Sequence, residues 1–183
     1  MSFNLYRRHL VKGLLYGLAS PYIISKLPIA QAAIANKPKQ LSFNNLHTGE
    51  KLKITYWANG QYIKEALTAA NYILRDFRTN QIYPIDLNLL ELLNDLQKKL
   101  DTTQNFEIIS GYRSPQTNIM LHKNSKGVAS KSLHMQGKAI DIFVPGRTLK
   151  QIQFAALDLR RGGVGYYPRS NFVHVDTGRV RNW

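Results

Sequence analysis

Two short apolar segments in the C-terminal third of the chain are expected to form buried strands, yet each contains charged or imidazole side chains. Residues 138–144 and 172–176 both alternate in the way of β-strands. The alternation places Asp141 on one face of the first segment, and His174 with Asp176 on one face of the second. An ionised carboxylate inside an apolar strand is unfavourable unless a partner compensates it, and a metal ion is one such partner. The two segments therefore predict a site as well as a sheet.

A third residue of ligand type, His134, precedes the first of these strands. Gly137 lies between His134 and Asp141 and allows the backbone to turn closely, so both side chains can converge on one point. Two imidazoles and one carboxylate are the ligands of a Zn²⁺ site that keeps a fourth position for a reactive water. We therefore predict that His134, Asp141 and His174 are the ligands of one hydrolytic metal site.

A tight turn ahead of the predicted site carries an arginine. Gly111 permits this turn after a strand that is expected over residues 106–109. Pro115 ends the pairing before a short helix that begins near Gln116. Arg113 then lies just beyond the strand end, where a guanidinium can bind a substrate carboxylate or stabilise an oxyanion. Capping of a helix, or pairing with an aspartate, is the structural alternative.

The remaining patterns predict an α+β fold, in which a small antiparallel sheet carries the metal site and packs with several helices. Apolar residues at helical spacing predict further helices over residues 61–77, 87–100 and 148–161. A hairpin is expected over residues 41–56, and a glycine-rich strand over residues 163–167. The apolar stripes of these helices are assigned to the core and not to chemistry.

Composition limits the classes to which the chain can belong. With 183 residues, of which 44% are hydrophobic, one globular domain is expected. The absence of cysteine excludes a disulfide framework, a thiolate metal site and every cysteine-nucleophile mechanism. No Ser-x-x-Lys sequence occurs, which excludes the serine penicillin-binding enzymes.

Residues 1–35 have the three-part layout of a secretory signal. A basic start with the pair Arg7-Arg8 precedes an apolar run of roughly a dozen residues, which is shorter than the ~20 that a membrane-spanning helix needs. The arginine pair resembles the twin-arginine export signal. We therefore expect export to the periplasm, and cleavage after either Ala32 or Ala35 fits the small-residue rule.

The domain that follows, residues 36–183, remains strongly basic. The full chain has a formal net charge of +14, and the preceding segment takes away only four basic residues and no acid. The basic residues are scattered and no nucleic-acid-binding motif accompanies them, so nucleic acid is not an expected partner. In an exported protein this charge suits an anionic cell wall or membrane surface, although a basic surface that only keeps the protein soluble is an equal alternative.

The motifs together resemble a known superfamily. The chain has Ser110-Gly111-Tyr112-Arg113-Ser114, then Ser132-x-His134-x-x-Gly137-x-Ala139-x-Asp141, then a later histidine on a strand. This order is similar to that of the zinc D-Ala-D-Ala carboxypeptidase and hedgehog-like superfamily. The arginine-pair signal and the closing segment, residues 172–183, resemble the murein endopeptidase K (YcbK-like) group, and the resemblance covers nearly all of the domain.

The resemblance implies a zinc metallopeptidase that acts on peptidoglycan stem peptides, with one Zn²⁺ per chain held by His134, Asp141 and His174. Arg113 matches a substrate-anchoring arginine of the superfamily, and Ser132 matches a position that helps to hold substrate. Members of the group cut cross-links between stem peptides, D-Ala-mDAP or mDAP-mDAP, during cell-wall growth. A D,D-carboxypeptidase on the same peptides and a non-catalytic zinc-containing wall-binding module are the alternatives. We further expect a monomer that associates transiently with a membrane or a lipoprotein.

One position departs from the pattern of the superfamily. Many carboxypeptidase relatives place a general-base glutamate three residues before the last histidine ligand, where this chain has Asn171. An amide cannot accept a proton from the attacking water. Asp176 is then either the base or a residue that orients His174, and His122 is a further candidate for the base.

Overall fold

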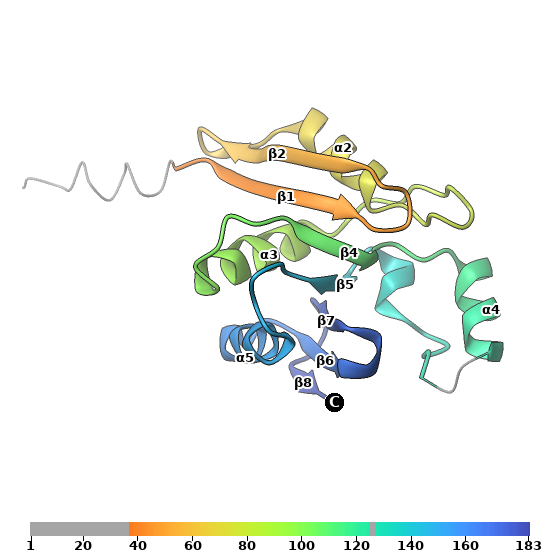
Figure 1. The fold of residues 1–183 in the computed structure, drawn as a ribbon. Helices are drawn as coiled ribbons and strands as arrows, with labels where there is room; N and C mark the ends of the chain where they lie inside the picture. Colours follow the sequence, from red (N-terminus) through yellow and green to blue (C-terminus); the bar gives the residue numbers. More distant parts are fainter. Residues whose placement is uncertain (1–36, 125–126) are drawn as a thin grey trace, which may run out of the picture.

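The computed structural model describes residues 37–124 and 127–183, and Figure 1 shows their arrangement. Within these residues, eight strands form one mixed sheet in the order β3-β2-β1-β4-β5-β7-β6-β8. The strands are β1 (Lys39–Asn45), β2 (Lys51–Ala58), β3 (Gln61–Tyr62), β4 (Phe106–Ser110), β5 (Ala139–Phe143), β6 (Gly163–Tyr167), β7 (Phe172–Asp176) and β8 (Arg181–Asn182). The signal segment predicted over residues 1–35 lies outside the described residues.

Helices and short 3₁₀ turns complete the described fold. They are α2 (Lys64–Ile73), α3 (Leu87–Lys99), α4 (Pro115–Asn124), α5 (Leu149–Leu159), η1 (Leu133–Gln136) and η2 (Pro168–Ser170). Because α3 packs against β1 and α5, and α5 packs against β6 and β7, these two helices line the sheet, whereas α4 stands to its side (Figure 1). In the described part of the chain, no helix has the length and apolar character needed to span a bilayer.

The α+β class predicted from the sequence is confirmed, but the sheet is larger than expected and not wholly antiparallel. The predicted hairpin forms as β1 and β2, and the two site strands pair antiparallel as β5 and β7. In contrast, β1 pairs parallel with β4, and β6 pairs parallel with β8. The β1–β4 pair requires a long crossover, and the segment that contains α2 and α3 provides it.

The helix predicted over residues 61–77 is shorter in the structure. Its first two residues form β3 instead, because they pair with the end of β2. The helix ends at Ile73, and the Asp76 amide donates to the Gln81 carbonyl oxygen (3.0 Å) in a loop. The other two helices predicted by spacing agree with α3 and α5 to within two residues at each end. Asp86 caps α3, since its Oδ1 accepts a hydrogen bond from the Asn88 amide (3.0 Å).

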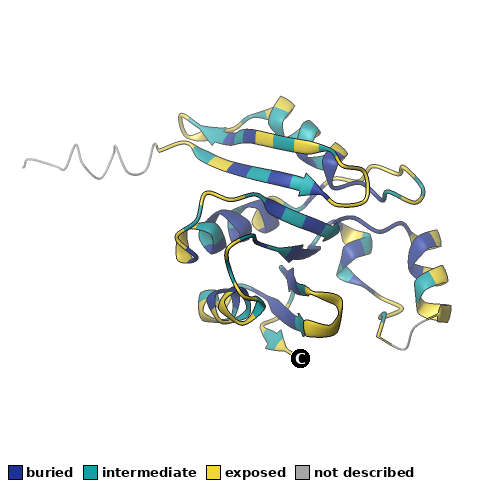
Figure 2. Cartoon of the chain, in the orientation of Figure 1, coloured by how far each residue is buried: buried dark blue, intermediate teal, exposed yellow. Residues whose placement is uncertain are grey.

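The leucine stripe of α3 forms the centre of the core, as its spacing predicts. Leu89, Leu93 and Leu96 have no exposed surface, and burial of each side chain contributes about 1.5–3 kcal/mol. They belong to the same buried cluster as Ile140 of β5 and Val173 of β7. Figure 2 shows the buried residues of α3 and of the central strands as dark blue segments of the ribbon. The alternate residues of β5 and β7 are therefore left for the opposite face of the sheet.

Candidate metal centre

Two neighbouring strands and a 3₁₀ turn bring the three predicted ligands together. Asp141 on β5 and His174 on β7 are paired directly across antiparallel strands. The turn η1 carries His134, whose amide donates to the capping Ser132 Oγ (3.4 Å). Gly137 ends η1 in the left-handed region at φ 64°, and a side chain there would collide with the backbone of the loop before α3. Glycine at this position therefore allows His134 to approach β5.

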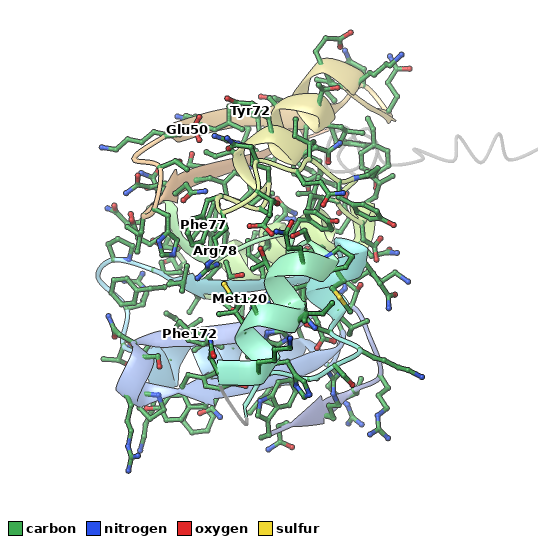
Figure 3. The ribbon with its side chains drawn as sticks, turned by 90° about the vertical axis from the view of Figure 1, so that its right-hand side faces the viewer. Glu50, Tyr72, Phe77, Arg78, Met120 and Phe172 are labelled. Atoms are coloured by element: carbon green, nitrogen blue, oxygen red, sulfur yellow. The ribbon has the colours of Figure 1, made fainter. Side chains whose placement is uncertain are left out.

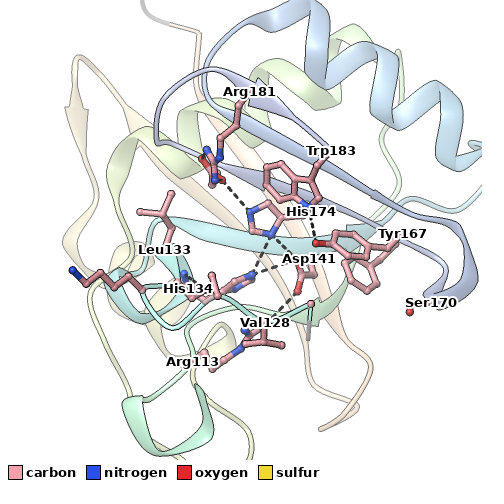
Figure 4. Close-up of a pocket in the computed structure, with 16 residues that line it drawn as sticks. Arg113, Val128, Leu133, His134, Asp141, Tyr167, Ser170, His174, Arg181 and Trp183 are labelled. Carbon is pink, nitrogen blue, oxygen red and sulfur yellow. Dashed lines mark hydrogen bonds and ion pairs between the residues drawn. The ribbon is translucent and has the colours of Figure 1, made fainter. Parts of the chain in front are cut away.

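The three ligand atoms form a small triangle on the face of the sheet opposite the core (Figure 4). His174 Nδ1 lies 2.8 Å from Asp141 Oδ1 and 3.2 Å from His134 Nε2, and His134 Nε2 lies 3.3 Å from Asp141 Oδ1. All three residues are buried. Zinc bonds of about 2.0–2.1 Å in a tetrahedral site separate two ligand atoms by about 3.3 Å. The triangle thus has nearly the size of one face of a tetrahedral metal site.

Hydrogen bonds on the far side of each imidazole determine which nitrogen carries the hydrogen. His134 Nδ1 lies 2.7 Å from the Gly111 carbonyl oxygen, and His174 Nε2 lies 3.0 Å from Asp176 Oδ2. A carbonyl and a carboxylate only accept, so these two nitrogens donate. The lone pairs of the other two nitrogens then face each other and the Asp141 carboxylate, an arrangement that is repulsive without a cation between them. The donor set therefore fits a bound metal ion.

The charges of these groups are strongly coupled. Burial raises the pKa of Asp141, but the His134 and His174 rings outweigh it and hold that pKa well below its ordinary value. Burial lowers the pKa of His174, whereas hydrogen bonds to Asp141 and Asp176 more than compensate and raise it to about 9, so without a metal ion a second proton occupies Nδ1. The cluster thus keeps an ionised carboxylate at its centre and favours a positive charge beside it.

Asp176 is completely buried and accepts five hydrogen bonds. Its Oδ1 accepts from the Gly163 and Gly178 amides (3.0 and 2.8 Å) and from Arg181 Nη1 (3.1 Å). Its Oδ2 accepts from Arg181 Nη2 (2.7 Å) and from His174 Nε2. Burial raises the pKa of Asp176, but these bonds outweigh it and keep the pKa well below its ordinary value. Asp176 thus contacts the nitrogen of His174 that points away from the other ligands.

Arg113 borders the ligand triangle from the turn after β4. Its Nη2 lies 3.7 Å from Asp141 Oδ2, and its Nη1 lies 3.5 Å from Asn118 Oδ1. Burial lowers the pKa of Arg113, and the nearby Asp141 charge offsets this only in part. The residue is 9% exposed, and its Nε has no hydrogen-bond partner among the described residues. A buried guanidinium with unused donors can bind an anionic or carbonyl oxygen.

A buried aspartate that was not predicted from the sequence holds the turn that carries Arg113. Asp76 accepts hydrogen bonds from the Ser114 and Arg78 amides, both at 2.9 Å. Burial raises the pKa of Asp76, but the hydrogen bonds that it accepts outweigh burial and lower the pKa. The same loop places Phe77 and Arg78 on the surface between α2 and α4, where the Arg78 guanidinium lies 4.2 Å from the Phe77 ring centre (Figure 3). The Asp76 carboxylate therefore anchors the Arg113 turn to the loop after α2.

The ligand triangle opens into a cleft of about 310 Å³ (Figure 4). The predicted substrate residues Arg113 and Ser132 both line it. Among the side chains that line the cleft without having been predicted as site residues are Tyr167, Arg181 and Trp183. Their positions depend on how the last strands pair, which residue type alone does not reveal.

Glycines on β6 are the sequence signal for these additional residues. Gly165 lies directly opposite His174 in the β6–β7 pair. A Cβ atom at Gly165 would lie 2.7 Å from the Trp183 ring, and one at Gly163 would collide with Arg181. Two glycines spaced by two residues on a strand indicate that another segment approaches that face closely. Here the approaching segment is the one that ends in Trp183.

Neither His122, a candidate for the base, nor Asn171, at the position of the superfamily's glutamate, lines the described part of the cleft. His122 is exposed on α4, and its Nδ1 lies 2.6 Å from the Val128 carbonyl oxygen. Asn171 is also exposed and follows η2 in the left-handed conformation, at φ 55°. The carboxylates and imidazoles that line the described cleft belong to the three predicted ligands and to Asp176.

Three residues that could hold a metal ion, fixed by outer hydrogen bonds and open to a cleft on one side, are typical of a metallohydrolase. The family described as "Peptidoglycan L,D-endopeptidase MepK" matches residues 33–183, and the chain belongs to this family. It is part of the M15 peptidases, which are metallopeptidases. The resemblance predicted from the sequence is thereby confirmed.

Individual relatives are similar over almost the whole chain. The "Peptidoglycan L,D-endopeptidase MepK" of Escherichia coli (strain K12) is 45% identical over 181 residues, which cover 99% of this chain and 98% of the relative. The protein of the same name from Shigella flexneri has the same identity and coverage. The "Probable peptidoglycan L,D-endopeptidase MepK" of Haemophilus influenzae is 43% identical over 163 residues, or 87% of this chain and 88% of the relative.

Proposed function

We propose that this chain is a zinc-dependent peptidoglycan endopeptidase that hydrolyses mDAP-mDAP cross-links between stem peptides. The observation that carries the proposal is the convergence of two fixed imidazole lone pairs and the Asp141 carboxylate at the base of an open cleft. The shared name of the relatives, L,D-endopeptidase, supports the choice of bond. An mDAP-mDAP bond is of this type because it joins the carbonyl of an L centre to the amine of a D centre.

His134, Asp141 and His174 are the residues that would hold the metal. A Zn²⁺ ion bound there supplies Lewis-acid polarisation of the scissile carbonyl and activation of a water at neutral pH. The chain itself prepares the ligands: the Gly111 carbonyl oxygen and the Asp176 carboxylate each take the outer N–H of one imidazole. Both rings are thereby held in the tautomer that presents a lone pair to the centre.

Asp176 acts in this proposal as the residue that positions His174, and not as the general base. Both of its oxygens already accept hydrogen bonds, two of them from Arg181. It also meets the far nitrogen of His174, so a water at the centre of the triangle lies on the other side of the ring. A base must come within hydrogen-bond reach of the proton that it abstracts.

Arg113 and Ser132 hold the substrate. A cross-linked mDAP residue carries a free carboxylate next to the bond that is cut, and the partly unsatisfied guanidinium of Arg113 suits such a group. The guanidinium approaches Asp141 to 3.7 Å, so a carboxylate that binds there lies close to the centre. Ser132 lines the same cleft beside His134.

Defined muropeptides test this function. The purified domain is incubated separately with mDAP-mDAP dimers, D-Ala-mDAP dimers and monomeric stem peptides. The products are identified by mass spectrometry. We expect cleavage of the mDAP-mDAP dimer, loss of this activity with a chelator, its return with Zn²⁺, and no activity of His134→Ala. Cleavage of D-Ala-mDAP dimers alone would change the assigned bond. Removal of the terminal D-Ala from monomers alone would indicate a carboxypeptidase, and binding to sacculi without turnover would indicate a wall-binding module.

We further propose that residues 1–35 direct export to the periplasm through the twin-arginine route, and that residues 36–183 act there as a monomeric domain. The pair Arg7-Arg8 and the relatives' peptidoglycan-directed names support this location. The double substitution Arg7→Lys and Arg8→Lys should retain the uncleaved protein in the cytoplasm, as measured by cell fractionation. Normal export of this variant would contradict the route.

A further inference from the structure

We propose that Tyr167 is a catalytic residue of this site, whose phenolic O–H donates a hydrogen bond to the scissile carbonyl oxygen as negative charge develops on it. The inference rests on the proposed peptidase function and adds a group that the ligand pattern does not contain. No proton is transferred in this role. The hydrogen bond strengthens as the carbonyl becomes an oxyanion, so it favours the transition state over the bound substrate.

The strand pairing places Tyr167 beside the ligand triangle. On β6, Gly165 is opposite His174 and Tyr167 is opposite Phe172. Alternation puts Tyr167 and Gly165 on the same face. The Trp183 indole lies over Gly165, where it contacts both the Tyr167 hydroxyl and the His174 ring. The Phe172 ring stacks on the Tyr167 ring with 4.5 Å between centres, which restricts movement of the phenol. Figure 4 shows the phenolic oxygen turned toward the His174–Asp141 pair.

A neighbouring indole sets the direction of the phenolic hydrogen. Trp183 Nε1 lies 2.6 Å from the Tyr167 hydroxyl oxygen. An indole N–H only donates, so the phenolic oxygen accepts this bond and its own hydrogen is left for another acceptor. Trp183 is itself anchored, since its amide donates to the Val164 carbonyl (3.2 Å) and its carbonyl accepts from the Tyr166 amide (3.0 Å). The Arg181 guanidinium covers the indole at 4.8 Å from the ring centre.

Two other polar groups of the described cleft, Asp176 and Ser132, already make hydrogen bonds within the protein. Asp176 accepts five hydrogen bonds, and Ser132 Oγ accepts the His134 amide. Arg113 and Tyr167 both line this cleft, so both donors are available to one bound substrate. Arg113 suits the substrate carboxylate because it is a cation, whereas the neutral phenol of Tyr167 suits the scissile carbonyl oxygen. Each donor thus binds a different group of the same substrate.

The variant Tyr167→Phe removes the hydroxyl and keeps the stacked ring. We expect kcat on the mDAP-mDAP dimer to fall about 100-fold, because loss of one oxyanion donor lowers kcat by about 10²–10³. KM should stay within about threefold and the zinc content should not change. Tyr166→Phe is the matched control, since Tyr166 packs against the core on the opposite face of the same strand, and we expect kcat near wild type. A kcat of Tyr167→Phe within threefold of wild type, or an effect confined to KM, overturns the assignment.

The variant Trp183→Phe tests how the phenol is oriented. It keeps an aromatic ring and removes the indole N–H, so kcat should fall about fivefold. The double variant Tyr167→Phe/Trp183→Phe should be no slower than Tyr167→Phe alone, because the indole acts only through the phenol. If Trp183→Phe lowers kcat equally in wild type and in Tyr167→Phe, the indole does not act by orienting the phenol and this part of the proposal is overturned. A zinc-loaded wild type without turnover refutes the proposed function itself, whereas an active wild type with an equally active Tyr167→Phe refutes only the role of Tyr167.

Discussion

Replacement of Asp176 by asparagine should reverse the hydrogen-bond direction at His174. An amide offers one accepting oxygen and one donating nitrogen. Two backbone amides donate to the Oδ1 position at 3.0 and 2.8 Å, so the new oxygen is required there and the new NH₂ group takes the Oδ2 position. That NH₂ group then faces the N–H of His174 Nε2. His174 relieves the conflict by moving its hydrogen to Nδ1, which lies 2.8 Å from Asp141 Oδ1 and then presents no lone pair to a metal.

The size of the effect follows from these contacts. Loss of an outer hydrogen bond to a ligating imidazole lowers metal affinity about 10–100-fold, or about 1.4–2.7 kcal/mol. The Arg181 guanidinium also loses its carboxylate. Breaking a buried ion pair costs about 3–5 kcal/mol, and we expect about 2 kcal/mol here because 31% of the Arg181 side chain is exposed to water. Asp176→Asn should therefore fold, with weaker metal binding and reduced stability.

Competition with a chromogenic chelator measures the zinc affinity, and turnover is measured separately at saturating Zn²⁺. We expect the affinity of Asp176→Asn to fall about 10–100-fold, with substantial turnover once the site is saturated. The exposed carboxylate of Asp158 on α5 provides a matched control, and Asp158→Asn should change neither quantity. If Asp176→Asn binds zinc as tightly as wild type but has no turnover at saturation, Asp176 is the general base and the positioning argument is wrong.

Three further substitutions test the scaffold. Folding lowers the pKa of Asp76, so its ionised form stabilises the protein above about pH 4 and this stability is lost as the pH falls through the folded-state value. Urea unfolding of Asp76→Asn should therefore show a smaller loss of stability on acidification than wild type. Gly165→Ala places a Cβ atom 2.7 Å from the Trp183 ring, so both Tm and kcat should fall. Leu93→Ala empties a fully buried position and should lower the free energy of unfolding by about 2–5 kcal/mol, while the zinc affinity of the folded protein stays unchanged.

The elements with a strong local pattern could be predicted from the sequence. The α3 leucines repeat at helical spacing and follow a capping Asp86, and β7 alternates around His174, so each element is determined by its own burial pattern. The early end of α2 could not be predicted, because Asp76 there bonds to Gln81 and to the distant Ser114 amide. The parallel β1–β4 pair likewise depends on how separate segments pack, which no local pattern contains.

That His134, Asp141 and His174 lie together could be predicted for a different reason. Asp141 lies in an apolar strand, where its charge requires a compensating partner such as a metal ion. His134 and His174 are residues of ligand type at positions from which they can bind the same ion. The role of Asp176 could not be assigned in this way, because it depends on which nitrogen of His174 the carboxylate meets. Tyr167 and Trp183 were missed because their contact joins β6 to the segment after β8, and only the paired glycines of β6 indicate it.

The central claim is that His134, Asp141 and His174 hold one catalytic metal ion, and a zinc titration of turnover tests it most directly. Chelator-treated protein is supplied with increasing Zn²⁺, and cleavage of the mDAP-mDAP dimer is measured at each step. We predict no cleavage without zinc, a rise that saturates at one equivalent per chain, and no rise for His134→Ala at any zinc concentration. Full turnover of the chelator-treated protein without added metal, or zinc-dependent turnover by His134→Ala equal to wild type, would contradict the account.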